Sequence, residues 1–249
     1  MKQKGGQNNT TYIERIEASN LLYAVTHRVI KRADLAQFLI EVPGSTSIDE
    51  LITLVCEIYN GYLKIGRICA EIDELAKHGV NLPPNLQGLT EDQVVDLKLK
   101  DEWGDKCIPS GGYIEYKDEI GRRNGRALCE KMVEVLKRTV DEAKQLIGRD
   151  TVNRDRCMNK ATVNEVPIML RGALTVVYPV ELPPYDPIKK ELDNEEDLSE
   201  ATLWISGKEM LREKLISDYV GRNEKTKIVA ELSKRGADAP AREPVTDEK

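Results

Sequence analysis

The chain has 249 residues, enough for one large domain or two small ones. Hydrophobic residues make up 40% and charged residues 32%, and the net charge of −6 argues against a general nucleic-acid-binding protein. No apolar run approaches the length of a membrane span, and the polar N-terminus lacks the apolar core of a signal peptide. The five cysteines are far apart and form no C-x-x-C pair, which fits reduced thiols in the cytosol better than a disulfide framework. We therefore expect a cytoplasmic protein with no nucleic-acid or membrane partner.

The chain begins with a polar stretch, residues 1–19, which we expect to be a disordered tail. Residues 21–30 and 35–42 predict two strands, and residues 31–34 can make the hairpin turn between them. A helix follows, and strand, turn, strand, helix is how a ubiquitin-like β-grasp begins. Other α+β folds begin in the same way. We assign residues 20–97 to a β-grasp-like N-terminal region of an α+β protein.

The first helix is predicted over residues 47–59, because Ser47 and Glu50 form a capping box and apolar residues follow with one-face helical spacing. Asn60-Gly61 is a stop signal, and a second helix is predicted over residues 62–77. Two helices in succession are therefore expected.

Residues 98–123 have no helical period, yet they are too long and too apolar for a plain connection. We predict an ordered crossover in which Trp103 and Ile108 are substantially buried. A strand is possible at residues 112–117. Just before the crossover, Thr90 and Gln93 make a second capping box that opens a short helix.

Residues 124–236 predict a mainly helical region with one or two further strands. The longest helix is expected over residues 124–147 with Asn124 as its cap, and the run ALTVVY at residues 173–178 predicts a buried strand. Pro167 argues for a break in the helix before that strand. Further helices are predicted at residues 163–170, 201–216 and 223–235, and at Asp186-Pro187, an N-cap followed by a first helical residue. Residues 237–249 are expected to be a second disordered tail.

Residues with the spacing of a catalytic or metal site are not found. The two histidines, His27 and His78, lie in different elements, and neither an H-E-x-x-H nor a G-x-S-x-G motif occurs. We therefore predict no enzyme activity, no catalytic residues, no metal site and no cofactor.

The best candidate for an anion or partner contact is the stretch 121–126, GRRNGR, at a predicted helix start. Its side chains would be Arg122, Arg123 and Arg126. It is neither a P-loop nor a G-x-G-x-x-G motif. The simpler interpretation is that the arginines pair with acidic neighbours such as Asp118 and Glu119.

Two aromatic residues, Tyr185 and Trp204, are candidate interface anchors, because tyrosine and tryptophan are enriched at binding hot spots. Core packing is the simpler interpretation of both. Charge is also uneven along the chain: residues 181–200 carry a net charge of −6, and residues 121–139 a net charge of +4. These two blocks can pair with each other or with partners, although two solvated faces are the simpler interpretation.

Several long strings resemble the kurly family of cilia- and flagella-associated proteins. They span most of the chain in the order expected for that family, and several such strings in register are far more specific than one short motif. The strings are EVPGST at 41–46, LAKHGVNLPPNLQGLTEDQ at 75–93, LKLKDEWGDKCIPSGG at 97–112, EIGRRNG at 119–125, LRGAL at 170–174, VYPVELPPYDPI at 177–188 and SDYVGRNEKTKIVAELSKRGADAPAREP at 217–244.

The resemblance implies a non-enzymatic cytoplasmic factor that is required for motile cilia and acts in the assembly of axonemal, mainly outer, dynein arms. It also implies protein partners in dynein arm preassembly, an association with the cilium or basal body, and a role in cilium positioning. It carries over no site residues. Two alternatives stay open: a structural component of the axoneme, and a phosphate- or nucleotide-sensing protein that uses Gly121 to Arg126.

Overall fold

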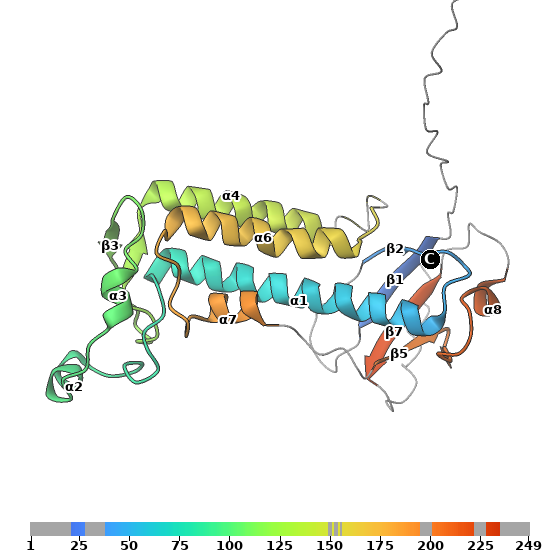
Figure 1. Ribbon diagram of the computed structural model, residues 1–249, viewed down its shortest axis with the longest axis horizontal. Coiled ribbons are helices and arrows are strands. Elements are labelled where there is room, and N and C mark those ends of the chain that lie inside the picture. Colours follow the sequence, from blue (N-terminus) through green and yellow to red (C-terminus); the bar gives the residue numbers. More distant parts are fainter. Residues whose placement is uncertain are drawn as a thin grey trace, which may run out of the picture.

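The computed structural model describes residues 21–27, 38–148, 151, 154, 156–194, 201–221 and 228–234, with the backbone alone at 21–27 and 234 (Figure 1). The turn predicted at 31–34 and the two predicted tails, 1–19 and 237–249, lie outside these residues. The fold is mixed α+β, as the sequence predicts, and consists of a small sheet and a helical arm that share one long helix.

The main sheet has five strands in the order β2-β1-β7-β5-β6. β1 pairs in parallel with β7, and the other neighbours are antiparallel. A parallel central pair flanked by antiparallel strands in this order is the arrangement of a ubiquitin-like β-grasp. The predicted β-grasp start is therefore correct, but the sheet is completed by strands from the other end of the chain. The bounds are Leu21–His27 for β1, Ile40–Glu41 for β2, Ala201–Ile205 for β5, Lys208–Glu209 for β6 and Val229–Lys234 for β7.

One continuous helix, α1 (Ile48–His78), replaces the two helices predicted at 47–59 and 62–77. The capping box of Ser47 and Glu50 at its start is confirmed. The predicted stop at Asn60-Gly61 is wrong, because Gly61 marks a close approach of two helices: a Cβ atom there would overlap Cγ1 of Val163. At about 1.5 Å per residue, 31 residues make a rod of roughly 46 Å.

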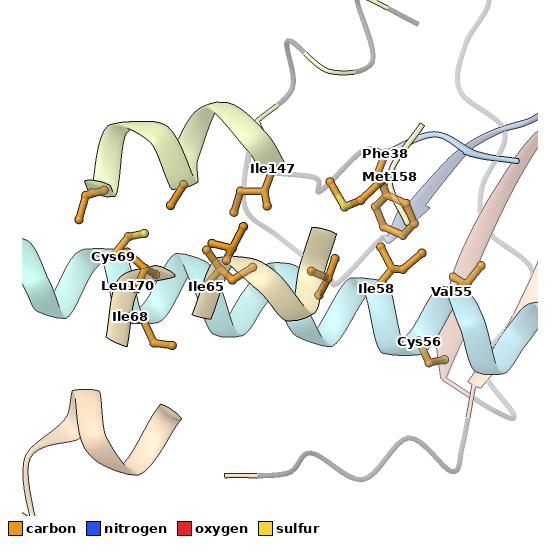
Figure 2. Packing of buried hydrophobic residues seen from close by; sticks show 14 of the residues in the cluster. Phe38, Val55, Cys56, Ile58, Ile65, Ile68, Cys69, Ile147, Met158 and Leu170 are labelled. Atoms are coloured by element: carbon orange, nitrogen blue, oxygen red, sulfur yellow. The ribbon is translucent and has the colours of Figure 1, made fainter. Parts of the chain in front are cut away.

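The helical arm is built on the C-terminal half of α1. Figure 1 shows α4 (Glu130–Ile147) and α6 (Lys160–Val177) along one side of α1, and the short α7 (Pro187–Asp193) on the other. The core lies between these helices, and in Figure 2 Phe38 and Met158 cover Ile58 of α1.

Two predictions for the arm are wrong. Residues 173–178 are not a strand, because α6 continues through Pro167 to Val177; its Leu174 and Val177 are buried in the helical core, which outweighs the β propensity of the run. The helix predicted from Asn124 begins only at Glu130. The residues before it, Arg126–Leu128, form β4, and α4 is shorter than α1.

The helices predicted at 201–216 and 223–235 are also wrong, because the strands of the main sheet replace them. β5 and β6 form a hairpin whose turn residues, Ser206 and Gly207, have positive φ angles of 50° and 77°. In β7, Ala230 and Leu232 are buried while Val229 is 60% exposed, which is the alternation of a strand with one covered face. Only one helical turn, α8 (Ser217–Val220), occurs between these strands among the described residues.

Residues 98–123, the predicted crossover, form with their neighbours the end of the arm away from the sheet (Figure 1). The capping box of Thr90 and Gln93 is confirmed. Trp103 is partly buried against the core, but Ile108 is 50% exposed, so its predicted burial is wrong. The elements here are α2 (Glu91–Asp96), α3 (Glu102–Lys106) and β3 (Tyr113–Glu115), which pairs antiparallel with β4.

Candidate functional site at the end of the arm

The end of the arm brings together the C-terminus of α1, the two short helices and the β3-β4 hairpin. Gly79, which follows α1, has a φ of 78°, and a Cβ atom there would overlap the backbone oxygen of Arg126 at 2.5 Å. The backbone N–H groups of Asn124 and Gly125 donate to the oxygens of Val80 and His78 at 3.0 and 2.9 Å. The stretch GRRNG, residues 121–125, is therefore hydrogen-bonded to the C-terminal end of the long helix and the residues that follow it.

Arg123 is buried and its guanidinium is engaged inside the protein. Nη1 donates to the oxygen of Gly79 at 2.8 Å, and Nη2 forms an ion pair with Glu71 on α1. Arg122 forms an ion pair with the same carboxylate, although 42% of its side chain is exposed. Glu71 thus holds both arginines against α1, where the sequence had indicated Asp118 or Glu119 as their partners.

Asp118 orders the loop that carries these arginines. Its Oδ2 accepts from the backbone N–H groups of Arg122 and Arg123, both at 2.8 Å, and its Oδ1 accepts from that of Ile120 at 3.1 Å. Partial burial alone would raise the pKa of Asp118, but these three hydrogen bonds outweigh it and hold the pKa below its ordinary value.

Asp186 joins α7 to the same region. It is fully buried, its Oδ1 accepts from the N–H of Ile188 at 3.0 Å, and its Oδ2 accepts from the N–H of Asn81 at 3.1 Å. It is also the N-cap of α7, as its sequence position before Pro187 predicts. Burial raises the pKa of Asp186, against the opposing effects of these N–H donors and of Arg123.

Arg126, the third predicted arginine, links α3 to the β3-β4 hairpin. It donates to the oxygen of Gly104, forms an ion pair with Asp105 at 3.2 Å, and lies over the ring of Tyr113 with its guanidinium carbon 5.1 Å from the ring centroid. The predicted anion contact thus consists of one buried arginine and two that are engaged with neighbours. All three arginines therefore have acidic partners within the protein, and these partners are Glu71 and Asp105 rather than Asp118 and Glu119.

The two predicted interface aromatics lie far apart. Tyr185 is half-buried beside the end of the arm, and its hydroxyl donates to Oδ1 of Asp101 at 3.3 Å. Trp204 lies in β5, in the sheet, and its Nε1 donates to Oγ of Ser233 at 2.8 Å. They do not belong to one surface.

The acidic and basic blocks of the sequence do not pair with each other through any ion pair found in the described residues. The acidic block, where it is described, pairs with the helices instead: Glu191 with Arg67 of α1 at 3.1 Å, and Asp193 with Arg171 of α6 at 2.8 Å. These pairs hold α7 to the arm.

A groove of about 1240 Å³ lies at the end of the arm, and sequence reasoning did not find it. Its wall includes Val95, Tyr116 and Ile120, which are 74%, 60% and 81% exposed. The apolar content of the crossover was the sequence signal for this groove, but we interpreted these apolar residues as buried. The internal partners Glu71 and Asp186 were also missed, because no local pattern links residues 50 or more positions apart.

Over the part of the chain that the structure describes, no group of three or more His, Cys, Asp or Glu side chains has an arrangement that could hold a metal ion. Among those same residues, no helix combines the length and the apolar character needed to cross a membrane.

Comparison with known proteins gives long matches. The chain is 53% identical over 228 residues to human cilia- and flagella-associated protein 298, covering 87% of this chain and 79% of the human one. It is 52% identical over 231 residues to the zebrafish (Danio rerio) protein of that name, covering 88% and 80%, and 42% identical over 228 residues to that of Drosophila melanogaster, covering 87% and 78%. The family model described as cilia- and flagella-associated protein 298 matches residues 201–249. No solved structure matches the chain.

Proposed function

Because this chain belongs to the cilia- and flagella-associated protein 298 family, we propose that it is a non-enzymatic factor that serves motile cilia by helping to assemble axonemal, chiefly outer, dynein arms. It acts in the cytoplasm and at the basal body, works through protein partners of dynein arm preassembly, needs no cofactor, and contributes to cilium positioning.

The observation that carries this proposal is the identity of 42–53% to curated relatives over most of the chain, because matches of this length support a function in cilia or flagella like that of the family. The arrangement of the molecule is consistent with it. The arginines at the end of the arm are engaged in holding the fold together, and what the arm presents to solvent is a groove lined in part by exposed apolar side chains. Such a surface suits contacts with other proteins.

Deletion of the gene in a ciliated cell tests the proposal. Cilia should still form, but they should beat poorly, and electron microscopy of cross-sections should show fewer dynein arms. Re-expression of the chain should restore both. Normal beating with intact arms after deletion would contradict the proposed function.

Fractionation tests where the protein acts. An assembly factor should be found mainly in the cytosol of the cell body, with some at the basal body. A chain that instead stays with axonemes after a salt wash is a structural component of the axoneme, the alternative that the sequence resemblance left open.

A further inference from the structure

The surface of the arm end combines apolar and acidic side chains in one concave place. Seven of the thirteen large apolar side chains that are exposed among the described residues lie between positions 95 and 120. Four of them line the groove of about 1240 Å³: Val95, Tyr113, Tyr116 and Ile120. Monomeric proteins seldom expose apolar side chains in such a concentration unless the surface binds something, and tyrosine is a frequent anchor at protein interfaces.

The charge of the groove is the second observation. Its lining holds six carboxylates, those of Glu91, Asp92, Asp101, Glu115, Asp118 and Glu119. Three basic side chains also line it, but each has a partner: Lys117 pairs with Glu91, Arg123 with Glu71 and Arg126 with Asp105.

Several of the carboxylates are available to a ligand. Asp92, Glu115 and Glu119 are exposed, and no hydrogen bond or ion pair engages them within the described part of the chain. Asp118 is occupied by three backbone N–H groups, and Asp101 by Gly104 and Tyr185. The groove thus offers apolar side chains beside unpaired negative charge.

We propose that this groove binds a segment of a partner protein in which lysine or arginine residues accompany apolar residues. The apolar side chains of the segment cover Tyr116 and Ile120, and its basic side chains meet Glu115 and Glu119. The acidic block of this chain, residues 181–200, has the wrong charge to be the occupant. An acidic surface also repels a second acidic surface, which disfavours self-association through the groove. This inference rests on the proposed function in one respect only, namely the cellular process in which the partner takes part.

The binding test uses the whole chain and three fluorescein-labelled peptides of equal length, built from leucine and lysine, from leucine and glutamate, and from serine and lysine. Fluorescence anisotropy should show binding of the leucine–lysine peptide, weakened by added salt, and much weaker binding of the other two. Equal binding of the leucine–glutamate peptide, or no binding of the leucine–lysine peptide, would overturn the proposal.

Matched variants locate the binding. Tyr116→Ser with Ile120→Ser should weaken the leucine–lysine peptide by about tenfold or more. Ile168→Ser with Val176→Ser, which changes two other exposed apolar residues, both on α6, should not. Glu115→Gln with Glu119→Gln should weaken binding severalfold and reduce its salt dependence, whereas Glu134→Gln with Glu142→Gln on the exposed face of α4 should leave it unchanged. All eight side chains are exposed, so the variants should keep the melting temperature of the parent. Equal weakening by the control variants would overturn the proposal.

Sedimentation and rescue of the deleted cell complete the test. A chain that dimerises, and becomes monomeric after Tyr116→Ser with Ile120→Ser, would show that a second copy occupies the groove and would overturn a separate partner. In cells, the parent chain should restore beating, and this double variant should not. If the parent chain does not restore beating, the proposed function is contradicted. If the variant restores beating fully, only the proposed binding by the groove is contradicted.

Discussion

Gly61 shows how one missing side chain determines helix packing. It lies in the middle of α1, where the absence of a Cβ atom admits the side chain of Val163 from α6. At Gly66, five residues further on, nothing beyond the adjacent backbone of α1 itself lies within 4 Å of the position where a Cβ atom would be. Two glycines of one helix therefore have different roles, one in close packing and one without any contact that requires it.

The matched pair Gly61→Ala and Gly66→Ala tests this difference. Gly66→Ala should raise the free energy of unfolding by about 0.5–1 kcal/mol, since alanine is the better helix former. Gly61→Ala should lower it by about 1–3 kcal/mol, because the new methyl group overpacks the contact with α6. Urea unfolding measures both changes. Adding Val163→Ala to Gly61→Ala should recover part of the loss, and equal stabilisation by the two alanines would contradict the packing role.

Arg122 and Arg123 are neighbours in sequence that differ in burial. The side chain of Arg123 is 2% exposed and that of Arg122 is 42% exposed, although both pair with Glu71. Arg123→Met should destabilise the protein by about 3 kcal/mol, because it removes a buried pairing and leaves the carboxylate of Asp186 without the positive charge near it. Arg122→Met should cost at most about 1 kcal/mol, as is typical of exposed ion pairs. Thermal and urea unfolding compare them, and similar losses for both would refute the assignment.

At the scale of elements, the loop between β3 and β4 depends on a carboxylate rather than on regular structure. Asp118 accepts from three backbone N–H groups within five residues, which turns the chain back toward Gly125 and positions both arginines on α1. Its pKa is below the ordinary value of about 3.9. A group with a lowered folded-state pKa stabilises the protein above its ordinary pKa, and that contribution is lost as the pH falls through the folded-state value.

Asp118→Asn should therefore reduce stability by about 1–2 kcal/mol at neutral pH, and the difference from the parent should diminish as the pH falls through the lowered folded-state pKa of Asp118. The neighbouring Glu119→Gln is the control, since Glu119 is exposed and makes no bond among the described residues. It should change stability by less than about 0.5 kcal/mol at any pH. Urea unfolding over a pH series measures both. A pH-independent loss in Asp118→Asn would contradict the role given to the charge.

At the scale of the whole molecule, α1 joins a β-grasp sheet to an arm that lies between α1 and β5 in the sequence. β7 connects the two halves of the sheet, because it pairs with β1 on one side and with β5 on the other. The first and last described elements of the chain therefore meet in the middle of the sheet, and its stability depends on contacts across some 200 residues.

Two substitutions in β7 test whether this strand holds the two halves of the sheet together. Leu232 is 4% exposed and Val229 is 60% exposed, three positions apart on one strand. Leu232→Asp should cost more than about 4 kcal/mol, because it buries an unpaired charge in the core, whereas Val229→Asp should cost less than about 1 kcal/mol. Hydrogen exchange should show lost protection in β1, β5 and the first half of α1 for Leu232→Asp. Unchanged protection there would mean that β7 does not hold the two halves of the sheet together.

Local patterns in the sequence were sufficient where a short-range interaction decides the outcome. The capping boxes at Ser47 and Thr90 and the N-cap at Asp186 were all predicted, because each needs only residues two or three positions away. The strand-strand-helix start was predicted from hydrophobic spacing, which depends on the chain nearby. Similarity along most of the chain indicated the family.

Only the tertiary structure decided the remaining features, because they depend on what a segment packs against. The apolar run ending at Val177 is helical because it packs against α1 and α4, and residues 229–234 form a strand because β1 and β5 flank them. A short apolar run fits either element until its neighbours are known. The arginines of the arm end were found in the sequence, but their partner Glu71 was not, because it lies 51 positions from Arg122. The apolar crossover likewise proved to be buried only in part: Trp103 packs against the core, whereas Tyr116 and Ile120 line an exposed groove.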